Sequence, residues 1–147
     1  MDSIQTPVVE FSAEVKTFNW LLGSFAKKTA GVEEAIVVSS DGLLMAKASK
    51  RERADCDRLA AVVSGMTSLA AGATEWYKLG ALNRVVVDLV DGYLVITSIS
   101  RGSALGVIAT KSANLGTVAF EMTLFGSRAG ATLTPGLIAE LKSAVQF

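Results

Sequence analysis

The chain has 147 residues, half of them apolar, which suits a single domain with a substantial core and excludes a disordered polypeptide. Fourteen basic residues balance 14 acidic ones, so the chain lacks the basic surface that nucleic-acid binding requires. There is no histidine and only one cysteine, Cys56, which excludes serine-histidine and cysteine-histidine catalytic pairs, zinc-histidine sites and an internal disulfide.

The N-terminal residues and the apolar runs bear on localisation. The opening segment MDSIQTPVVE has no basic stretch followed by an apolar one, so it does not resemble a secretory signal peptide. No apolar run approaches the roughly 20 residues of a membrane span. Together with the single cysteine, these features predict a cytoplasmic protein without membrane insertion.

The chain is expected to divide into a lead-in over residues 1–11, a domain over 12–130 and a short C-terminal helix over 131–147. Ser12 is a suitable N-cap for a first helix, whose apolar residues repeat at helical spacing until Gly31. Apolar runs at 35–38 and 43–45 then predict two strands.

Asp-Gly pairs follow two of the predicted strands. Asp41-Gly42 separates the first two strands, and Asp91-Gly92 separates strands predicted over 85–90 and 93–99. An Asp-Gly pair between apolar runs favours a type I′ hairpin turn, which requires two positive φ angles. Because the pattern occurs twice in equivalent settings, we interpret both pairs as turns and not as catalytic carboxylates. A fifth strand is expected over 103–110.

A long helix is predicted between the two hairpins, over residues 54–78. One stripe is expected to face the core, flanked by Val62, Leu69 and Trp76 at seven-residue intervals. Its members are Leu59, Val63, Met66, Ala70, Ala73 and Tyr77. The opposite face is expected to hold small residues only, and no charge occurs between Leu59 and Thr74. That face comprises Ala61, Ser64, Gly65, Ser68, Ala71 and Gly72. Such a face predicts close packing against another subunit or a partner protein.

Two further helices complete the pattern. Ser112 is expected to cap a third helix that ends at Gly130. Thr134-Pro135 has the sequence of an N-cap and first helical residue of a short final helix. The final helix could dock on the body of the domain or contact a partner, and its sequence does not distinguish the two. Hairpins predict an antiparallel sheet, and strands that are almost continuously apolar predict helices on both of its faces.

No motif predicts catalysis, a cofactor or a metal ion. The segment from Gly106 to Ser112 resembles a phosphate-binding loop only superficially, because both required glycines are missing. Cys56 lies between two aspartates, which disfavour its thiolate. The charges between Arg51 and Arg58 alternate in sign, which is typical of a solvated surface or a partner contact.

The order and spacing of several short motifs resemble the bacterial branch of the roadblock domain family, over roughly residues 14 to 142. This family includes the dynein light chain roadblock and bacterial regulators of small Ras-like GTPases. The motifs are Trp20-Leu21-Leu22, Gly31-Val32, Ser40-Asp41-Gly42-Leu43, Asp57-Arg58-Leu59-Ala60-Ala61-Val62, Ser64-Gly65, Asp91-Gly92-Tyr93-Leu94, Leu115-Gly116, Phe120-Glu121-Met122 and Leu133-Thr134-Pro135.

The resemblance implies an α+β fold in which a five-stranded antiparallel sheet has the second helix on one face and the first and third helices on the other. It also implies a homodimer whose third strands pair and whose second helices pack together. The implied role is a non-enzymatic regulator or scaffold for a small Ras-like GTPase. The alternative is a structural or sensory adaptor for a histidine-kinase-like partner, without GTPase contact. Arg51, Arg53 and Arg58 are candidates for an arginine finger.

The third strand has a charge pattern that suggests how two copies could pair. If antiparallel pairing across a two-fold axis centres on Val86, Arg84 lies opposite Asp88 of the second copy. Solvation of both charges, or pairing within one chain, is the alternative. These three residues complete the predicted dimer or partner interface.

Overall fold

The computed structural model describes residues 11–100 and 102–145 of the chain. Its elements follow the predicted order of helix, two strands, helix, three strands and two helices. They are α1 (Ala13–Lys28), β1 (Val32–Ser39), β2 (Leu44–Ala48), α2 (Arg53–Tyr77), β3 (Arg84–Leu89), β4 (Gly92–Ser100), β5 (Ser103–Thr110), α3 (Leu115–Ala129), a 3-10 turn η1 (Gly130–Thr132) and α4 (Pro135–Ala144).

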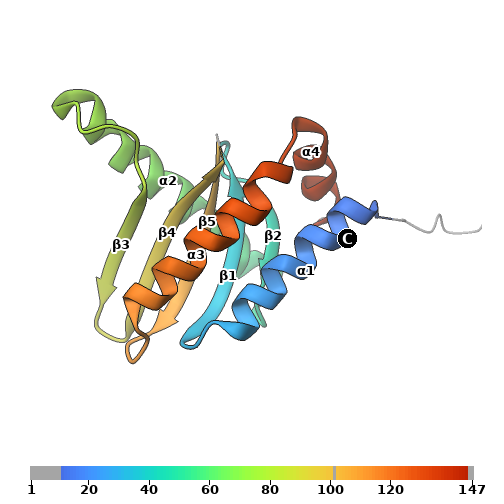
Figure 1. Cartoon of the computed structure of the whole chain (residues 1–147), viewed down its shortest axis with the longest axis horizontal. Helices are drawn as coiled ribbons and strands as arrows, with labels where there is room; N and C mark the ends of the chain where they lie inside the picture. Colours follow the sequence, from blue (N-terminus) through green and yellow to red (C-terminus); the bar gives the residue numbers. More distant parts are fainter. Residues whose placement is uncertain (1–10, 101, 146–147) are drawn as a thin grey trace, which may run out of the picture.

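The strands form one antiparallel sheet in the order β2-β1-β5-β4-β3. Helices α1 and α3 lie on one face of the sheet and α2 lies on the other, as Figure 1 shows. The predicted fold class is therefore confirmed. β2 and β3 are the two edge strands, and the last turns of α2 extend past β3 (Figure 1).

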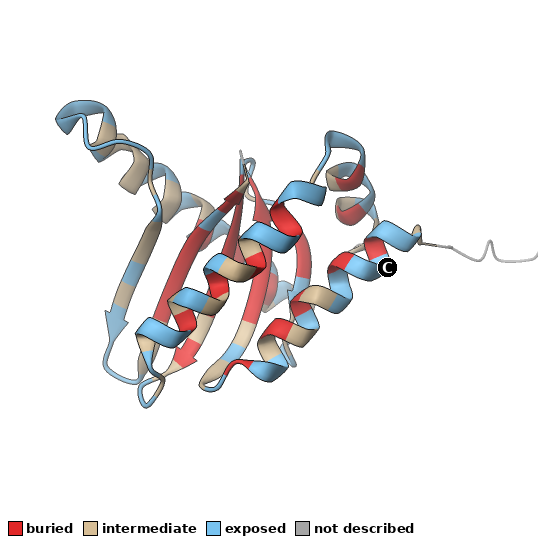
Figure 2. Cartoon of the chain, in the orientation of Figure 1, coloured by how far each residue is buried: buried red, intermediate tan, exposed pale blue. Residues whose placement is uncertain are grey.

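Alternating side chains of the sheet build a separate core on each face. Ala35 and Val37 of β1 pack toward α1 and α3, whereas Ile36 and Val38 pack toward α2. Figure 2 shows buried residues along the central strands and on the inner sides of the helices. Because both faces are covered, the strands are apolar at almost every position, as expected for a doubly covered sheet.

The two predicted N-caps at the ends of the chain are confirmed, and the one between them is wrong. The Ser12 side chain accepts a hydrogen bond from the Val15 N–H, and the Thr134 side chain caps α4, which begins at Pro135. α3 is capped by Asn114 and not by Ser112, whose hydroxyl bonds Thr110 instead. The asparagine side chain is an equally good capping acceptor two residues further on.

The predicted turns exist, but neither is of type I′. In the first hairpin only Gly42 has a positive φ, of 81°, within a three-residue connection from Ser40 to Gly42. In the second hairpin the loop is Val90-Asp91, and neither residue has a positive φ. Gly92 belongs to β4, where a Cβ atom would lie 2.9 Å from the Ala109 carbonyl oxygen. That glycine therefore permits a close strand approach instead of a turn.

Helix α2 contacts the sheet through the first half of the predicted stripe, since Val63 is buried and Leu59 and Met66 pack against the core on this face. Its buried residues are Cys56, Ala60 and Val63, and a Cβ added to Gly106 of β5 would lie 2.6 Å from Val63. Of the residues expected to face the core, Tyr77 is exposed. Small side chains bring α2 close to the sheet at its N-terminal half, while its C-terminal turns pass beyond the sheet edge (Figure 1).

Helix α4 docks on the body of the domain, on the face that α1 and α3 also cover. Leu137 and Leu141 are buried in the same core as those helices. At its end, Arg53 Nη1 of α2 donates a hydrogen bond to the Val145 carbonyl oxygen. The Lys142 ammonium lies 3.2 Å from the Asp41 carboxylate in the first hairpin turn.

Candidate association surface

Three large apolar side chains on α2 point away from the sheet at seven-residue intervals. Val62, Leu69 and Trp76 are 47, 81 and 86% exposed. We call these three residues the α2 seam. Their spacing places them on one stripe of the helix, the arrangement by which helices pair. The sequence shows this spacing, but assigning the residues to the flank of the core was wrong.

Glycines beside the α2 seam leave the helix backbone accessible. A Cβ atom added at Gly65 or Gly72 would meet no neighbouring atom within 4 Å. Each glycine costs a helix interior about 1 kcal/mol relative to alanine. No packing contact within the described chain requires either glycine, so their position on this face fits close approach by a second backbone. Ala61 is exposed on the same side.

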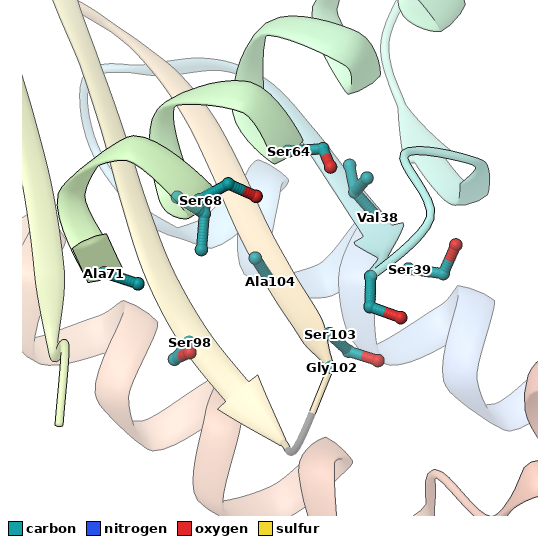
Figure 3. A pocket seen from close by; sticks show the side chains of 11 residues that line it. Val38, Ser39, Ser64, Ser68, Ala71, Ser98, Gly102, Ser103 and Ala104 are labelled. Atoms are coloured by element: carbon teal, nitrogen blue, oxygen red, sulfur yellow. The ribbon is translucent and has the colours of Figure 1, made fainter. Parts of the chain in front are cut away.

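The other predicted members of the small-residue face lie elsewhere. Ser64, Ser68 and Ala71 border a hollow of about 190 Å³ between α2 and the ends of β1, β4 and β5. Figure 3 shows them on the α2 side of this hollow, opposite Val38 and Ala104. The predicted face is therefore divided, because Ser64, Ser68 and Ala71 lie on the side of α2 that borders the sheet. Only Ala61, Gly65 and Gly72 accompany the α2 seam.

Strand β3 provides a second exposed feature. It is an edge strand that pairs with β4 on one side only, so its outer backbone groups have no partner strand among the described residues. Val86 and Leu89 are each about half exposed, and Val90 is 89% exposed. An apolar edge of this kind requires cover by another chain or by solvating residues.

The charges of β3 are both engaged within the chain. Arg84 donates hydrogen bonds to Thr97 and to two acceptors on α3. Asp88 pairs with Lys111, whose ammonium also lies 4.3 Å from the centre of the Tyr93 ring. Because Lys111 already pairs with Asp88 and neutral acceptors on β4 and α3 hold Arg84, the electrostatic argument for a Val86-centred register is weakened, and the register itself stays a prediction.

The three candidate arginine fingers differ in how strongly other groups of the chain hold their side chains. Arg51 pairs with Glu34 at 3.0 Å, and Arg53 is held by Asp57 at 2.9 Å and by the end of α4. Arg58 contacts Asp55 at 3.4 Å and its side chain is 81% exposed. Arg58 is therefore the candidate with the greatest reach toward a partner.

Two titratable groups have shifted pKa values, and both lie in surface ion pairs. The hydrogen bond from the Ser39 hydroxyl, followed by the contact with Lys142, lowers the pKa of Asp41 below its ordinary value of 3.8. The hydrogen bond to Asp88 raises the pKa of Lys111 above its ordinary value of 10.5. Asp41 thus serves as a charged anchor for α4, consistent with its position in a turn.

Residues 11–100 and 102–145 contain neither a candidate metal site nor a candidate membrane span. No three acidic, cysteine or histidine side chains come together in a way that could hold a metal ion. No helix in this part of the chain has the length and apolar character needed to cross a membrane.

The fold and the motifs match one family. The model of the Roadblock/LC7 domain matches residues 18–109. A Roadblock/LC7 domain from Streptomyces avermitilis is 25% identical, with a TM-score of 0.72 over 75% of this chain and 92% of that chain. A second such domain from this organism is 30% identical, with a TM-score of 0.62 over 75% of this chain and 95% of that one.

More distant structures share the fold. Myxococcus xanthus MglB is 18% identical, with a TM-score of 0.71 over 90% of this chain and 96% of that chain. A search of curated protein sequences found no match. The family model covers more than half of the chain, and the protein therefore belongs to the Roadblock/LC7 domain family.

Proposed function

We propose that the protein is a non-enzymatic, homodimeric regulator of a small Ras-like GTPase. The observation that carries this proposal is the α2 seam, Val62, Leu69 and Trp76, which projects into solvent from an uncharged stretch of helix. Large apolar side chains rarely line up on a free surface without a binding role.

In the proposed dimer, two copies of α2 pack through the α2 seam across a two-fold axis. Gly65 and Gly72 allow the helices to approach closely. Each seam residue would be buried twice, once in each copy, because a two-fold interface uses the same patch on both subunits. Burying one such side chain contributes about 1.5–3 kcal/mol.

The β3 edges are proposed to pair across the same axis. Antiparallel pairing would give the outer backbone groups of β3 hydrogen-bond partners and cover the exposed side chain of Val86. We retain the register centred on Val86 as part of the proposal, now supported by the apolar edge and not by Arg84 and Asp88.

The GTPase is proposed as the partner because roadblock domains of the bacterial branch resemble regulators of this class. The similar structures include MglB in a tetrameric arrangement and MglC from Myxococcus xanthus. Arg58 is the proposed contact residue, since it is exposed at the start of α2, next to the dimer surface.

The test uses the purified protein, its Leu69→Arg variant and a Ras-like GTPase from the same organism. Sedimentation should show a dimer for the wild type and a folded monomer for Leu69→Arg. Fluorescence anisotropy should show binding of the wild type to the GTPase loaded with GDP or a GTP analogue, and weaker binding of the variant. Binding to neither form would refute the GTPase role, and binding only to a histidine-kinase-like sensor would favour the adaptor. A monomeric wild type would refute the dimer.

A further inference from the structure

Arg84 is a half-buried cation whose protein partners are all neutral. Its side chain leaves the edge strand β3, crosses β4 and reaches α3. Nε donates to Thr97 Oγ1 at 3.1 Å, and Nη2 donates to the Ala119 carbonyl oxygen at 3.1 Å and to Thr123 Oγ1 at 2.8 Å. The guanidinium is thereby fixed in position without any compensating charge.

The described part of the chain offers Arg84 no carboxylate. Five ion pairs occur among these residues, and Arg84 takes part in none of them. Both N–H groups of Nη1 are also left without an acceptor in the described residues. Removing a guanidinium from water costs free energy unless an anion accompanies it, so an anion beside Arg84 would offset part of this cost.

A surface hollow adjoins the guanidinium. It has a volume of about 500 Å³ and lies between the start of β3, the end of β4 and the second half of α3. Its lining also includes Asn83 and Ser127, whose side chains can donate hydrogen bonds. The Thr123 hydroxyl is already engaged, because it accepts from Arg84 Nη2 and donates to the Ala119 carbonyl oxygen. No acidic residue lines the hollow. Leu82, Ile99 and Gly126 supply an apolar remainder.

We propose that this hollow binds a small organic oxyanion, a carboxylate or a phosphate ester. Two of its oxygens would accept from the free Nη1 group, a charge-assisted contact of the kind that guanidinium groups make best. The Ser127 hydroxyl and the Asn83 side-chain amide would donate hydrogen bonds to the remaining oxygens. The hollow is larger than a single phosphate ion, and its volume lies within the usual range for small-molecule sites.

The site lies on the other face of the sheet from the α2 seam, although it adjoins the β3 edge that is proposed to pair with a second copy. Arg84 points back over β4 toward α3, away from the free edge of β3 and away from α2 on the opposite face of the sheet. The inference therefore does not rest on the proposed function. The competing explanation is that Arg84 only ties β3 to α3 and that water completes its hydrogen bonds.

The binding test follows amide shifts of the ¹⁵N-labelled protein by NMR during titration with inorganic phosphate, and separately with acetate, at constant ionic strength set by chloride. Saturable shifts in the millimolar range are expected for residues around the hollow. They should be lost in Arg84→Gln and kept in Arg58→Gln, which removes the same charge from an exposed position on α2. A response to phosphate alone assigns a phosphate ester, and a response to acetate assigns a carboxylate. No saturable shift with either probe overturns the proposal, as does an unchanged response in Arg84→Gln.

A second variant tests the anion site while the hydrogen bonds between Arg84 and α3 stay intact. Ser127→Glu places a carboxylate at the wall of the hollow while Arg84 remains. It should abolish the anion response and raise the melting temperature, whereas Ser127→Gln should do neither. If Ser127→Glu leaves both quantities at the values of Ser127→Gln, the guanidinium does not accept an anion there and the proposal is wrong.

Discussion

Leu69 offers the sharpest test of the α2 seam because it contributes nothing visible to the monomer. Its side chain is 81% exposed and lies on the outer side of α2. Leu69→Ala should therefore leave the folded monomer intact, since alanine is also a slightly better helix former. Any loss of association then reports on the interface and not on the fold. Ser68 is a poorer position for this test, because it borders the hollow beside the sheet.

The expected loss of dimerisation free energy is the loss at one Leu69 side chain, counted once for each of the two subunits. A leucine side chain that becomes buried in the centre of an interface and is truncated to alanine loses about 2 kcal/mol. The two-fold axis doubles this to about 4 kcal/mol, which raises the dissociation constant of the dimer about 1000-fold. A dimer with a micromolar dissociation constant would then have a millimolar one and would dissociate at ordinary protein concentrations.

The assay is sedimentation equilibrium at several concentrations, with far-UV circular dichroism to confirm the helix content. Phe120→Ala is the matched control, since Phe120 is an exposed aromatic residue on α3, on the opposite face of the sheet. A dissociation constant for Leu69→Ala within about threefold of the wild-type value, a difference of about 0.6 kcal/mol, would refute the α2 seam. Equal weakening by Phe120→Ala would show that the loss is not specific.

Four further variants test other parts of the structure. Gly72→Ala meets no atom within the chain, so thermal unfolding of the monomer should show a gain of about 1 kcal/mol while sedimentation shows a weaker dimer. Gly130→Ala would place its Cβ 2.0 Å from the Ile99 carbonyl oxygen, so urea unfolding should show a loss of about 2–3 kcal/mol or more. Because the folded-state pKa of Asp41 is lowered, its stabilisation is present above its unfolded pKa of 3.8 and is lost as the pH falls through the folded value. Asp41→Asn should therefore reduce stability near neutral pH and give a shallower acid limb in urea titrations, an effect that Lys142→Met should share.

Element order could be predicted from the sequence because it depends on local signals. Ser12, Thr134 and Pro135 sit where capping chemistry requires them, and the apolar runs mark all five strands. The turn types are harder to predict from the sequence, since they depend on the register of the paired strands. Asp91-Gly92 resembles a type I′ turn, yet the close approach of the Ala109 carbonyl draws Gly92 into β4 and moves the loop to Val90-Asp91.

The partners of Arg84 and Asp88 could not be found from the sequence. Their alternation in β3 places both on the same face of the strand, which the sequence does show. The acceptors for Arg84 lie 13 to 39 positions away, on β4 and α3, and Lys111 reaches Asp88 from the end of β5. A long, flexible side chain can bind any suitable group within its reach in the folded protein. The residue pattern along one strand therefore does not show which group it binds.

The orientation of α2 depends on how its side chains fill the space against the sheet, which the periodicity of its sequence does not show. Its sequence contains two apolar stripes, one of small residues around Cys56 and Ala60 and one of large residues along the α2 seam. A preference based on hydrophobicity sends the larger stripe inward. The sheet face opposite α2 carries Ile36, Val38, Leu94 and Ile96, and α2 packs on it through Cys56, Ala60 and Val63, with Leu59 and Met66 at the margin of the contact. The large stripe is thus excluded from the core by packing, and the apolar surface that remains outside is the surface available for a second subunit.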